Sequence, residues 1–188
     1  MARVAHTTRS EQTAQARLRI LEVAGMMFAE RGYDETAIQD VATELGLTRA
    51  ALHNHYASKA DILREIIDAE TAQFLATLDA IGAIKCRTDR MNATVAALVA
   101  AGLNQRLRIV FLVSDPVVSA LPNAADGRPK VFDRVARVIY GETTTPEQVF
   151  AVNAAFVSFA AVSAFPHLTD EQLSLILTRA LLRLQGVH

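Results

Sequence analysis

Few residues in this chain of 188 favour irregular or cross-linked structure. It has eight glycines and five prolines, so long irregular segments are not expected. Its one cysteine, Cys86, cannot form an internal disulfide, which fits a protein of the reducing cytoplasm. Alternating runs of β-branched residues are scarce, while alanine and leucine are abundant. This composition favours an all-helical (all-α) protein.

The chain also lacks a surplus of positive charge. Its formal net charge is -1, and residues 1–64 balance eight Lys or Arg against eight Asp or Glu. A surface that attracts nucleic acid must therefore come from the arrangement of charges rather than from their number. The first ten residues carry Arg3, His6 and Arg9 without an acid. Residues 1–12 are expected to form either a solvated tail or a flexible basic arm near DNA phosphates.

No segment predicts a membrane anchor or a secretion signal. No apolar run follows the N-terminal charges, so no signal peptide is expected. Residues 149–165 are mostly apolar, but their length is at the lower limit of about 17 residues for a spanning helix. Asn153, Ser158 and Ser163 interrupt this run and Pro166 follows it. A helix buried against other helices explains the run better than a membrane partner does.

Residues that could support catalysis are sparse as well. Five histidines and one cysteine provide few metal ligands, and His53 and His55 are two residues apart, so they point to different sides of a helix. The motifs HExxH and GxSxG are missing, and so is a glycine-rich phosphate loop. The sequence therefore predicts no enzyme, no metal site and no cofactor.

The most informative stretch is residues 37–56, AIQDVATELGLTRAALHNHY. Val41, Ala42 and Leu45 give a first short helix an apolar face, Gly46 breaks the pattern, and a second apolar series ends with Leu52. Glycine suits the turn because it adopts positive φ without a steric clash, and Thr48 can cap the second helix. This spacing is typical of a helix-turn-helix, whose second helix enters the DNA major groove.

Helix signals surround this motif. Apolar residues at helical spacing predict a helix over residues 13–31 that ends at Gly32. Thr36 and Gln39 form a predicted capping box for the next helix, and Ser58 with Asp61 predicts the start of a fourth.

Together these segments resemble the DNA-binding domain of the TetR (tetracycline repressor) family. The resemblance covers about fifty continuous residues and rests on Arg17, Ile20-Leu21, Ala24, FAERGYDET (28–36), VATELGLT (41–48), Leu52, HYASK (55–59) and Ile62-Leu63. It implies a three-helix DNA-binding domain, here residues 13–60, followed by a helical ligand-binding and dimerisation domain, here residues 61–188. Residue spacing in the second part predicts helices over 58–82, 89–103 and 130–140, a short apolar piece over 104–113, a start at Asp115-Pro116, and a loop over 122–129.

The last two helices are the expected dimer interface. Thr145-Pro146-Glu147-Gln148 and Thr169-Asp170-Glu171-Gln172 predict their first turns. Two such helices from each of two chains would form a four-helix bundle, although both could instead close the core of one chain. The residues expected at this interface are Ala151, Ala154, Ala155, Ser158, Ala161, Leu173, Ile176, Leu177, Ala180, Leu181 and Leu184, with Ala164 extending the small-residue face.

The resemblance and the exposed side of the second motif helix together predict the DNA contacts. Arg49 can bind guanine or a phosphate, Asn54 can pair with adenine, and Lys59 can reach a phosphate. Tyr56 can equally pack beneath the helix. His53 replaces a tyrosine that is common in the family, and Ala50 replaces a common glycine. Because His53 is charged only when protonated, DNA binding is expected to strengthen in mildly acidic solution. The residues predicted at the DNA interface are Thr36, Gln39, Thr48, Arg49, Ala50, His53, Asn54, Tyr56 and Lys59.

A ligand pocket in the second domain is also implied by the resemblance. Its candidate lining residues are Phe74, Leu78, Leu98, Arg106, Phe111, Phe132, Asn153 and Phe156, with His167 as a further polar partner. For each apolar member, packing in the hydrophobic core is favoured over contact with a ligand. Since apolar side chains dominate, a small, mainly apolar effector is expected. The sequence thus predicts a homodimeric, ligand-responsive transcriptional regulator that binds a double-stranded, pseudo-palindromic DNA operator, with repression favoured; a regulator without a ligand, or an activator, is the alternative.

Overall fold

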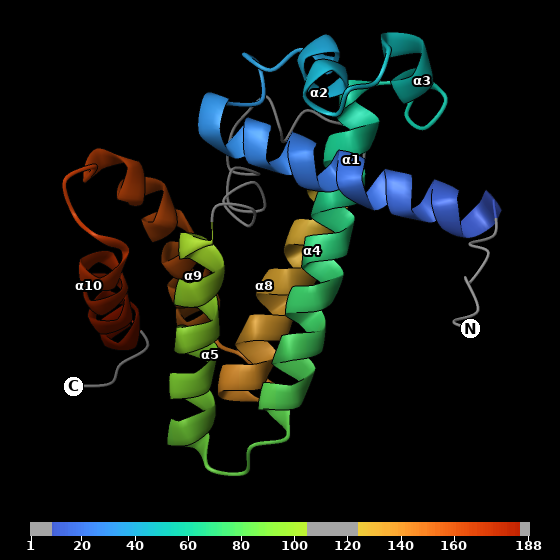
Figure 1. Cartoon of the computed structure of the whole chain (residues 1–188). Coiled ribbons are helices and arrows are strands. Elements are labelled where there is room, and N and C mark those ends of the chain that lie inside the picture. Colours follow the sequence, from blue (N-terminus) through green and yellow to red (C-terminus); the bar gives the residue numbers. More distant parts are fainter. Residues whose placement is uncertain (1–8, 105–123, 185–188) are drawn as a thin grey trace, which may run out of the picture. The chain divides into compact units, whose positions relative to one another are not determined.

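The computed structural model describes residues 9–104 and 124–184, and every regular element within these ranges is a helix, which confirms the all-α prediction. The chain divides into two compact units, residues 1–66 and residues 67–188 (Figure 1). Helix α4 (Lys59–Gly82) begins in the first unit and continues into the second. The division lies inside this helix, a few residues beyond the boundary expected from the sequence.

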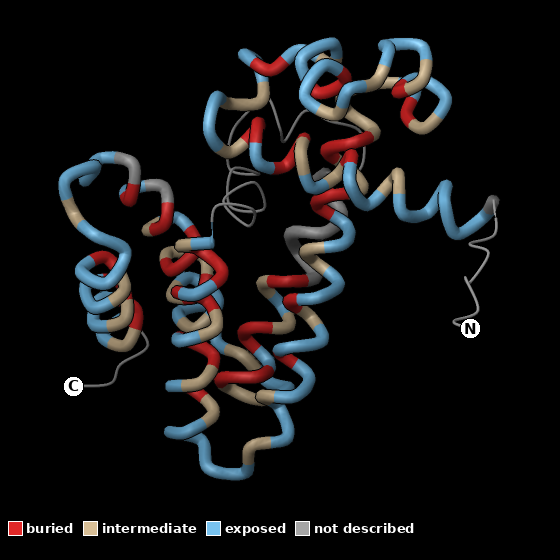
Figure 2. Tube along the Cα trace, in the orientation of Figure 1, coloured by how far each residue is buried: buried red, intermediate tan, exposed pale blue. Residues whose placement is uncertain are grey.

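The first unit packs α1 (Arg9–Arg31), α2 (Ile38–Glu44), α3 (Arg49–His53) and the start of α4 around a small core (Figure 2). Its fully buried side chains include Ile20, Phe28, Val41, Leu52 and Ile62. Buried residues recur at intervals of three or four on α1, where Ala24 and Met27 lie between Ile20 and Phe28, so this helix has one apolar face. Helix α1 begins at Arg9, not at residue 13, so residues 9–12 are helical and the predicted arm is wrong there. Residues 1–8 lie outside the described residues.

The connection between α1 and α2 differs from the sequence prediction. Gly32 ends α1 at φ +92°, as predicted. Thr36, however, is completely buried, and its hydroxyl donates to the Gly32 carbonyl at 2.8 Å. Helix α2 is capped one residue later, where the Ala37 N–H donates to the Asp40 carboxylate at 3.0 Å. The predicted pair of Thr36 and Gln39 is therefore wrong, because the Thr36 hydroxyl instead satisfies the end of α1.

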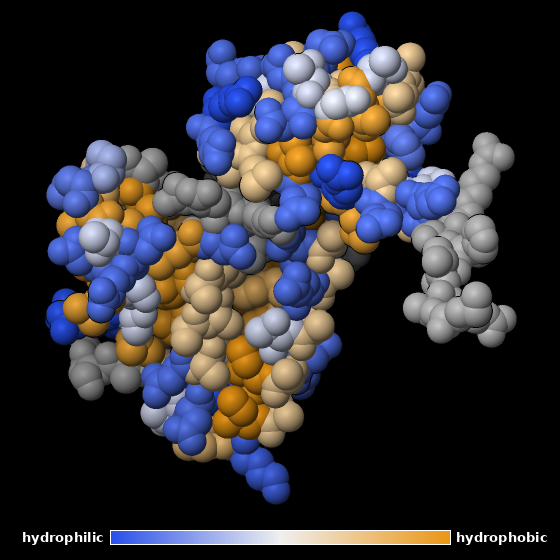
Figure 3. All heavy atoms as spheres, in the orientation of Figure 1, coloured by the Kyte–Doolittle hydropathy of each residue, from blue (hydrophilic) through white to orange (hydrophobic). Residues whose placement is uncertain are grey.

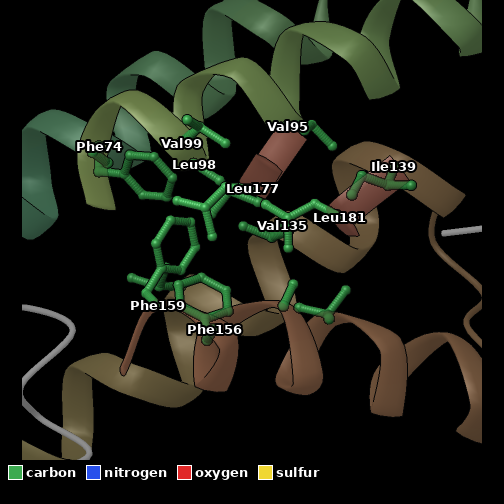
Figure 4. Packing of buried hydrophobic residues seen from close by; sticks show 14 of the residues in the cluster. Phe74, Val95, Leu98, Val99, Val135, Ile139, Phe156, Phe159, Leu177 and Leu181 are labelled. Carbon is green, nitrogen blue, oxygen red and sulfur yellow. The ribbon is translucent and has the colours of Figure 1, made fainter. Parts of the chain in front are cut away.

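The second unit contains the rest of α4, α5 (Arg87–Leu103), α8 (Ala124–Tyr140), α9 (Pro146–Ser158), the 3-10 helix η2 (Phe159–Ala164) and α10 (Asp170–Leu184). Helix α5 packs against α8 and α10, and α8 packs against α9. Figure 4 shows Phe156, Phe159 and Leu177 pointing toward one another in this core. Gly102 of α5 allows close packing there, since a β-carbon at this position would lie 2.2 Å from the Phe159 ring.

Three predicted helix starts are confirmed by hydrogen bonds. The Ser58 hydroxyl accepts from the Asp61 N–H at 3.2 Å and donates to the Asp61 carboxylate at 2.7 Å. Thr145 and Gln148 form a capping box at α9, with Pro146 as its first residue. Thr169 and Gln172 make the same reciprocal pair at α10. These side chains satisfy N–H groups that have no partner inside the helix.

Two helix boundaries correct the prediction. Helix α5 begins at Arg87, directly after the exposed Cys86, instead of at residue 89. Residues 124–129 belong to α8, so the predicted loop over 122–129 is wrong for most of its length. Glycine and proline have low helix propensity and often mark turns, but α8 runs through both Gly127 and Pro129 here. The pieces predicted at 104–113 and 115–116 fall, except for Asn104, outside the described residues.

The predicted small-residue face on the last two helices is interrupted. Helix α9 ends at Ser158, and the chain continues as a 3-10 helix through Ala164. The spacing predicted for one continuous α-helix therefore ends at Ser158, because a 3-10 helix turns every three residues instead of about every 3.6.

Within the described parts of the chain, no helix combines the length and apolar character needed to cross a bilayer.

Candidate nucleic-acid interface

The turn between α2 and α3 has the geometry that the motif requires. Gly46 adopts φ +67°, and the Leu47 N–H donates to the Ala42 carbonyl at 2.8 Å, which closes the end of α2. Leu52 is completely buried together with Val41 and Ala42. A small residue at Ala42 and a larger one at Leu52 therefore fix the angle between the two helices, as predicted.

Helix α3 is capped at its start by Thr48. Its hydroxyl accepts from the Ala51 N–H at 3.1 Å, as predicted. The helix contains only five residues, so it depends on this cap and on Leu52 rather than on its own hydrogen bonds.

Four predicted DNA contacts share the exposed side of this helix. Arg49, Ala50, His53 and Asn54 are all exposed, while Leu52 between them is buried. Arg49 is the first residue of α3, and no described contact within the chain uses its guanidinium group. The structure therefore brings a bidentate donor, an imidazole and an amide to one surface, the combination needed for base edges and phosphates.

The other predicted DNA-binding residues are placed differently. Gln39 is exposed, and its amide lies 3.5 Å from the Thr43 hydroxyl. Lys59 is half-buried, because its ammonium group donates to the Tyr33 carbonyl at 2.6 Å and lies 4.1 Å from the centre of the Tyr33 ring. Thr36 and Tyr56 are buried. The prediction that Thr36 and Tyr56 contact DNA directly is therefore wrong. Both side chains pack between the helices of the first unit instead.

Tyr56 belongs to a cluster that the sequence did not identify. Arg17 of α1 lies over its ring, 4.6 Å from the ring centre, and also pairs with Glu65 of α4. Burial, reinforced by Glu65, raises the pKa of Tyr56 to about 12. The hydrogen bond to Glu65 raises the pKa of Arg17. Arg17 contributes to the family resemblance, but its partners lie 38 and 48 residues away, so no local pattern could assign its role.

The candidate ligand-binding residues mostly belong to the core of the second unit. Leu78 and Leu98 are buried, and the ring centres of Phe132 and Phe156 lie 4.1 Å apart. Asn153 donates to the Val149 carbonyl of its own helix at 2.8 Å. His167 is exposed beside Phe165. Arg106 and Phe111 lie outside the described residues.

One cleft between α4 and α5 includes a predicted ligand-binding residue, Phe74. It holds about 210 Å³, less than the roughly 300 Å³ at which small-molecule pockets begin. Apolar residues gather on the face between these two helices (Figure 3). The cleft is lined by Glu70, Gln73, Phe74 and Thr77 of α4 and by Ala97, Ala100, Ala101 and Asn104 of α5.

The apolar stripe predicted on α10 consists of two rows. Leu173, Leu177 and Leu181 are buried in the core of the chain itself, so the prediction that they form a dimer interface is wrong. Ile176, Ala180 and Leu184 are exposed. On α9, Ala155 is buried, Ala151, Ala154 and Ser158 are half-buried, and Ala161 beyond it is exposed. Phe150 and Val157, which the small-residue pattern did not include, are 75% and 64% exposed.

Metal ligation has no support in residues 9–104 and 124–184, where no group of three His, Cys, Asp or Glu side chains could hold an ion.

Comparison with known proteins identifies the family to which the first unit belongs. The sequence profile described as bacterial regulatory proteins, tetR family, matches residues 20–66, from the middle of α1 into α4. This range contains both motif helices and the turn at Gly46. Residues 20–66 therefore match the TetR family, in the part of the chain that holds the helix-turn-helix.

Two TetR-family relatives from Mycobacterium tuberculosis extend this comparison. The transcriptional repressor KstR2 is 38% identical over 56 residues, which cover 30% of this chain and 28% of KstR2, so the chain matches less than a third of that relative. The proposed mycofactocin biosynthesis transcriptional regulator MftR is 29% identical over 168 residues, covering 83% of this chain and 81% of MftR.

A solved structure shows the same fold across both units. AibR, crystallised in complex with isovaleryl coenzyme A and operator DNA, superposes with a TM-score of 0.68. The superposition covers 87% of this chain and 96% of AibR at 18% sequence identity.

Proposed function

We propose that this protein is a ligand-responsive transcriptional regulator of the TetR family, most simply a repressor, that binds a pseudo-palindromic operator as a homodimer. The main support for this proposal is the surface of α3. This helix exposes Arg49, His53 and Asn54, while its buried Leu52 anchors it to the rest of the unit. In a symmetric dimer, two such helices would enter successive major grooves, about 34 Å apart.

The test of this proposal is selection from random DNA, followed by footprinting of the selected sequence with the full chain. A regulator of this kind should select two inverted half-sites about one helical turn apart. It should protect both, and its affinity should fall steeply with salt. Selection of no sequence at low salt would refute a specific DNA-binding function.

We further propose that the homodimer forms through the exposed apolar side chains of α9 and α10. Phe150 and Val157 on α9, and Ile176 and Leu184 on α10, are large apolar residues exposed to solvent in the single chain. Large exposed apolar patches are typical of association surfaces. This assignment retains the predicted helices but replaces the small-residue face with the larger exposed side chains.

Replacing Phe150 with alanine should raise the dimer dissociation constant about tenfold or more, because both protomers lose an apolar contact. Sedimentation over a range of protein concentrations measures this constant. Leu18→Ala is the matched control, since Leu18 is an apolar residue on α1 with similar exposure, 67% against 75% for Phe150. An unchanged dissociation constant for Phe150→Ala would place the interface elsewhere.

The proposed effector is a small, mainly apolar molecule that binds in the second unit. Apolar residues on the face between α4 and α5 support this class of ligand. AibR was crystallised with both isovaleryl coenzyme A and operator DNA, which supports a response to a ligand but not an apolar one, because coenzyme A is highly charged. A ligand can shift DNA affinity only by its differential affinity for the two protein states, typically about 1–3 kcal/mol. If DNA affinity does not change across an apolar compound library, a regulator without a ligand becomes the better description.

A further inference from the structure

The C-terminal end of α3 is held by a side chain from outside the helix-turn-helix. Arg17 of α1 donates from Nη1 to the backbone carbonyl of His55 at 3.4 Å. The same guanidinium group lies 4.6 Å from the centre of the Tyr56 ring. Its other terminal nitrogen forms an ion pair with Glu65 of α4. One planar group thus connects α1, the residues that follow α3, and α4.

Helix α3 needs such support because it cannot hold its own conformation. It has five residues, and an isolated helix of this length is not stable in water. Its last backbone bonds run from Asn54 to Ala50 and from Tyr56 to Leu52, after which the carbonyl groups have no partner within the helix. Thr48 fixes the start and Leu52 fixes the middle, so Arg17 is the group that reaches the end.

The exposure of the ion pair indicates what the cluster contributes. The side chains of Arg17 and Glu65 are 41% and 38% exposed. Exposed ion pairs add little to folding stability. A guanidinium group, however, combines rigid hydrogen-bond directions with stacking on an aromatic ring. We therefore expect the cluster to fix the position of α3 more than it adds to the folding stability of the first unit.

Resting on the proposed function of α3 in operator binding, we propose that Arg17 is a positioning residue for DNA recognition, with Glu65 as its anchor on α4. It holds the His55 carbonyl and the Tyr56 ring, so that Arg49, His53 and Asn54 face DNA in one fixed orientation. Arg17 need not contact DNA for this role, because it acts through the backbone at the end of α3.

Glu65→Ala separates this role from simple charge attraction. Removing an acid from a DNA-binding surface should tighten binding if charge alone mattered. If Glu65 anchors Arg17, the variant should instead bind the selected operator about tenfold more weakly. Asp68→Ala, which removes an exposed acid from the same helix, is the matched control and should not weaken binding.

Arg17→Gln should weaken operator binding more than Arg19→Gln, which removes an equal charge from an exposed position on the same helix. Combining Arg17→Gln with Glu65→Ala should weaken binding no further than Arg17→Gln alone, because both substitutions remove one shared contact. Arg17→Lys keeps the charge but not the planar stacking group, so its affinity should lie between wild type and Arg17→Gln.

Amide hydrogen exchange provides a readout that does not depend on DNA. In Arg17→Gln and Glu65→Ala, the amides of Asn54, His55 and Tyr56 should exchange faster, while those of Ala24 and Phe28 in α1 should keep the wild-type rate. A role in overall stability would accelerate all of these amides together.

Two results would overturn the proposal: operator affinity of Glu65→Ala equal to or tighter than wild type, or unchanged exchange at the end of α3 in both variants. If wild type selects no DNA sequence, the proposed function fails instead. The exchange rates then decide by themselves whether Arg17 positions α3.

Discussion

Arg49→Ala should lower affinity for the selected operator by at least about 30-fold. Arg49 opens α3 on its exposed side, where a guanidinium group can bind a guanine edge or a phosphate with two donors. Such a pair contributes about 1–3 kcal/mol, and a symmetric dimer loses it twice, for a total of about 2–6 kcal/mol. Quantitative footprinting at fixed salt measures this loss.

The pattern of the loss identifies what Arg49 contacts. If it reads a base, selection with Arg49→Ala should yield a consensus that is relaxed at one position of each half-site. If it binds a phosphate, all sequences should weaken alike and the salt dependence should become shallower. Arg31→Ala, an exposed arginine outside the motif, is the matched control. Equal affinities for Arg49→Ala and Arg31→Ala would remove Arg49 from the interface.

Gly102→Ala should destabilise the protein by about 1–3 kcal/mol, although alanine in a helix usually stabilises relative to glycine. The added β-carbon would lie 2.2 Å from two ring carbons of Phe159, far closer than van der Waals contact allows. Phe159 is 6% exposed and packs in the same core as Phe156 and Leu177, so its ring cannot move without disturbing its neighbours. The midpoint of urea unfolding at fixed protein concentration measures the change.

A second glycine substitution shows whether the clash with Phe159 causes the loss of stability. In Gly82→Ala the nearest atom to the new β-carbon is 3.9 Å away, so that variant should be as stable as wild type or slightly more stable. Adding Phe159→Leu to Gly102→Ala should recover part of the loss, because the smaller side chain leaves room. If Gly102→Ala alone unfolds at the wild-type midpoint, α5 and η2 do not pack as closely as described.

Features determined by neighbouring residues could be predicted from the sequence. The pairs at Ser58, Thr145 and Thr169 mark helix starts because a capping side chain reaches only three residues along the chain. The turn at Gly46 and the plug at Leu52 follow from spacing within one motif. For the same reason the exposed side of α3 was identified correctly.

Features determined by distant contacts could not be predicted. Lys59 looked available for a phosphate, yet its ammonium group binds the Tyr33 carbonyl, 26 residues away. The capping role of Thr36 failed because its hydroxyl is used at the end of α1. On α10 the pattern revealed an apolar stripe but not that Leu177 faces the chain's own core while Ile176 faces outward. Helical periodicity shows which residues share an apolar face of a helix. Only the packed structure shows which of them the chain's own core covers.

The position of Cys86 has a practical consequence. It is the only cysteine in the chain, and it is exposed directly before α5, outside the buried core. A thiol-reactive spin label should therefore attach at one defined point per chain without the removal of any other residue. In a homodimer, two such labels define a single inter-protomer distance. Pulsed electron paramagnetic resonance could follow that distance as operator DNA or an effector is added, and so report which state each one selects.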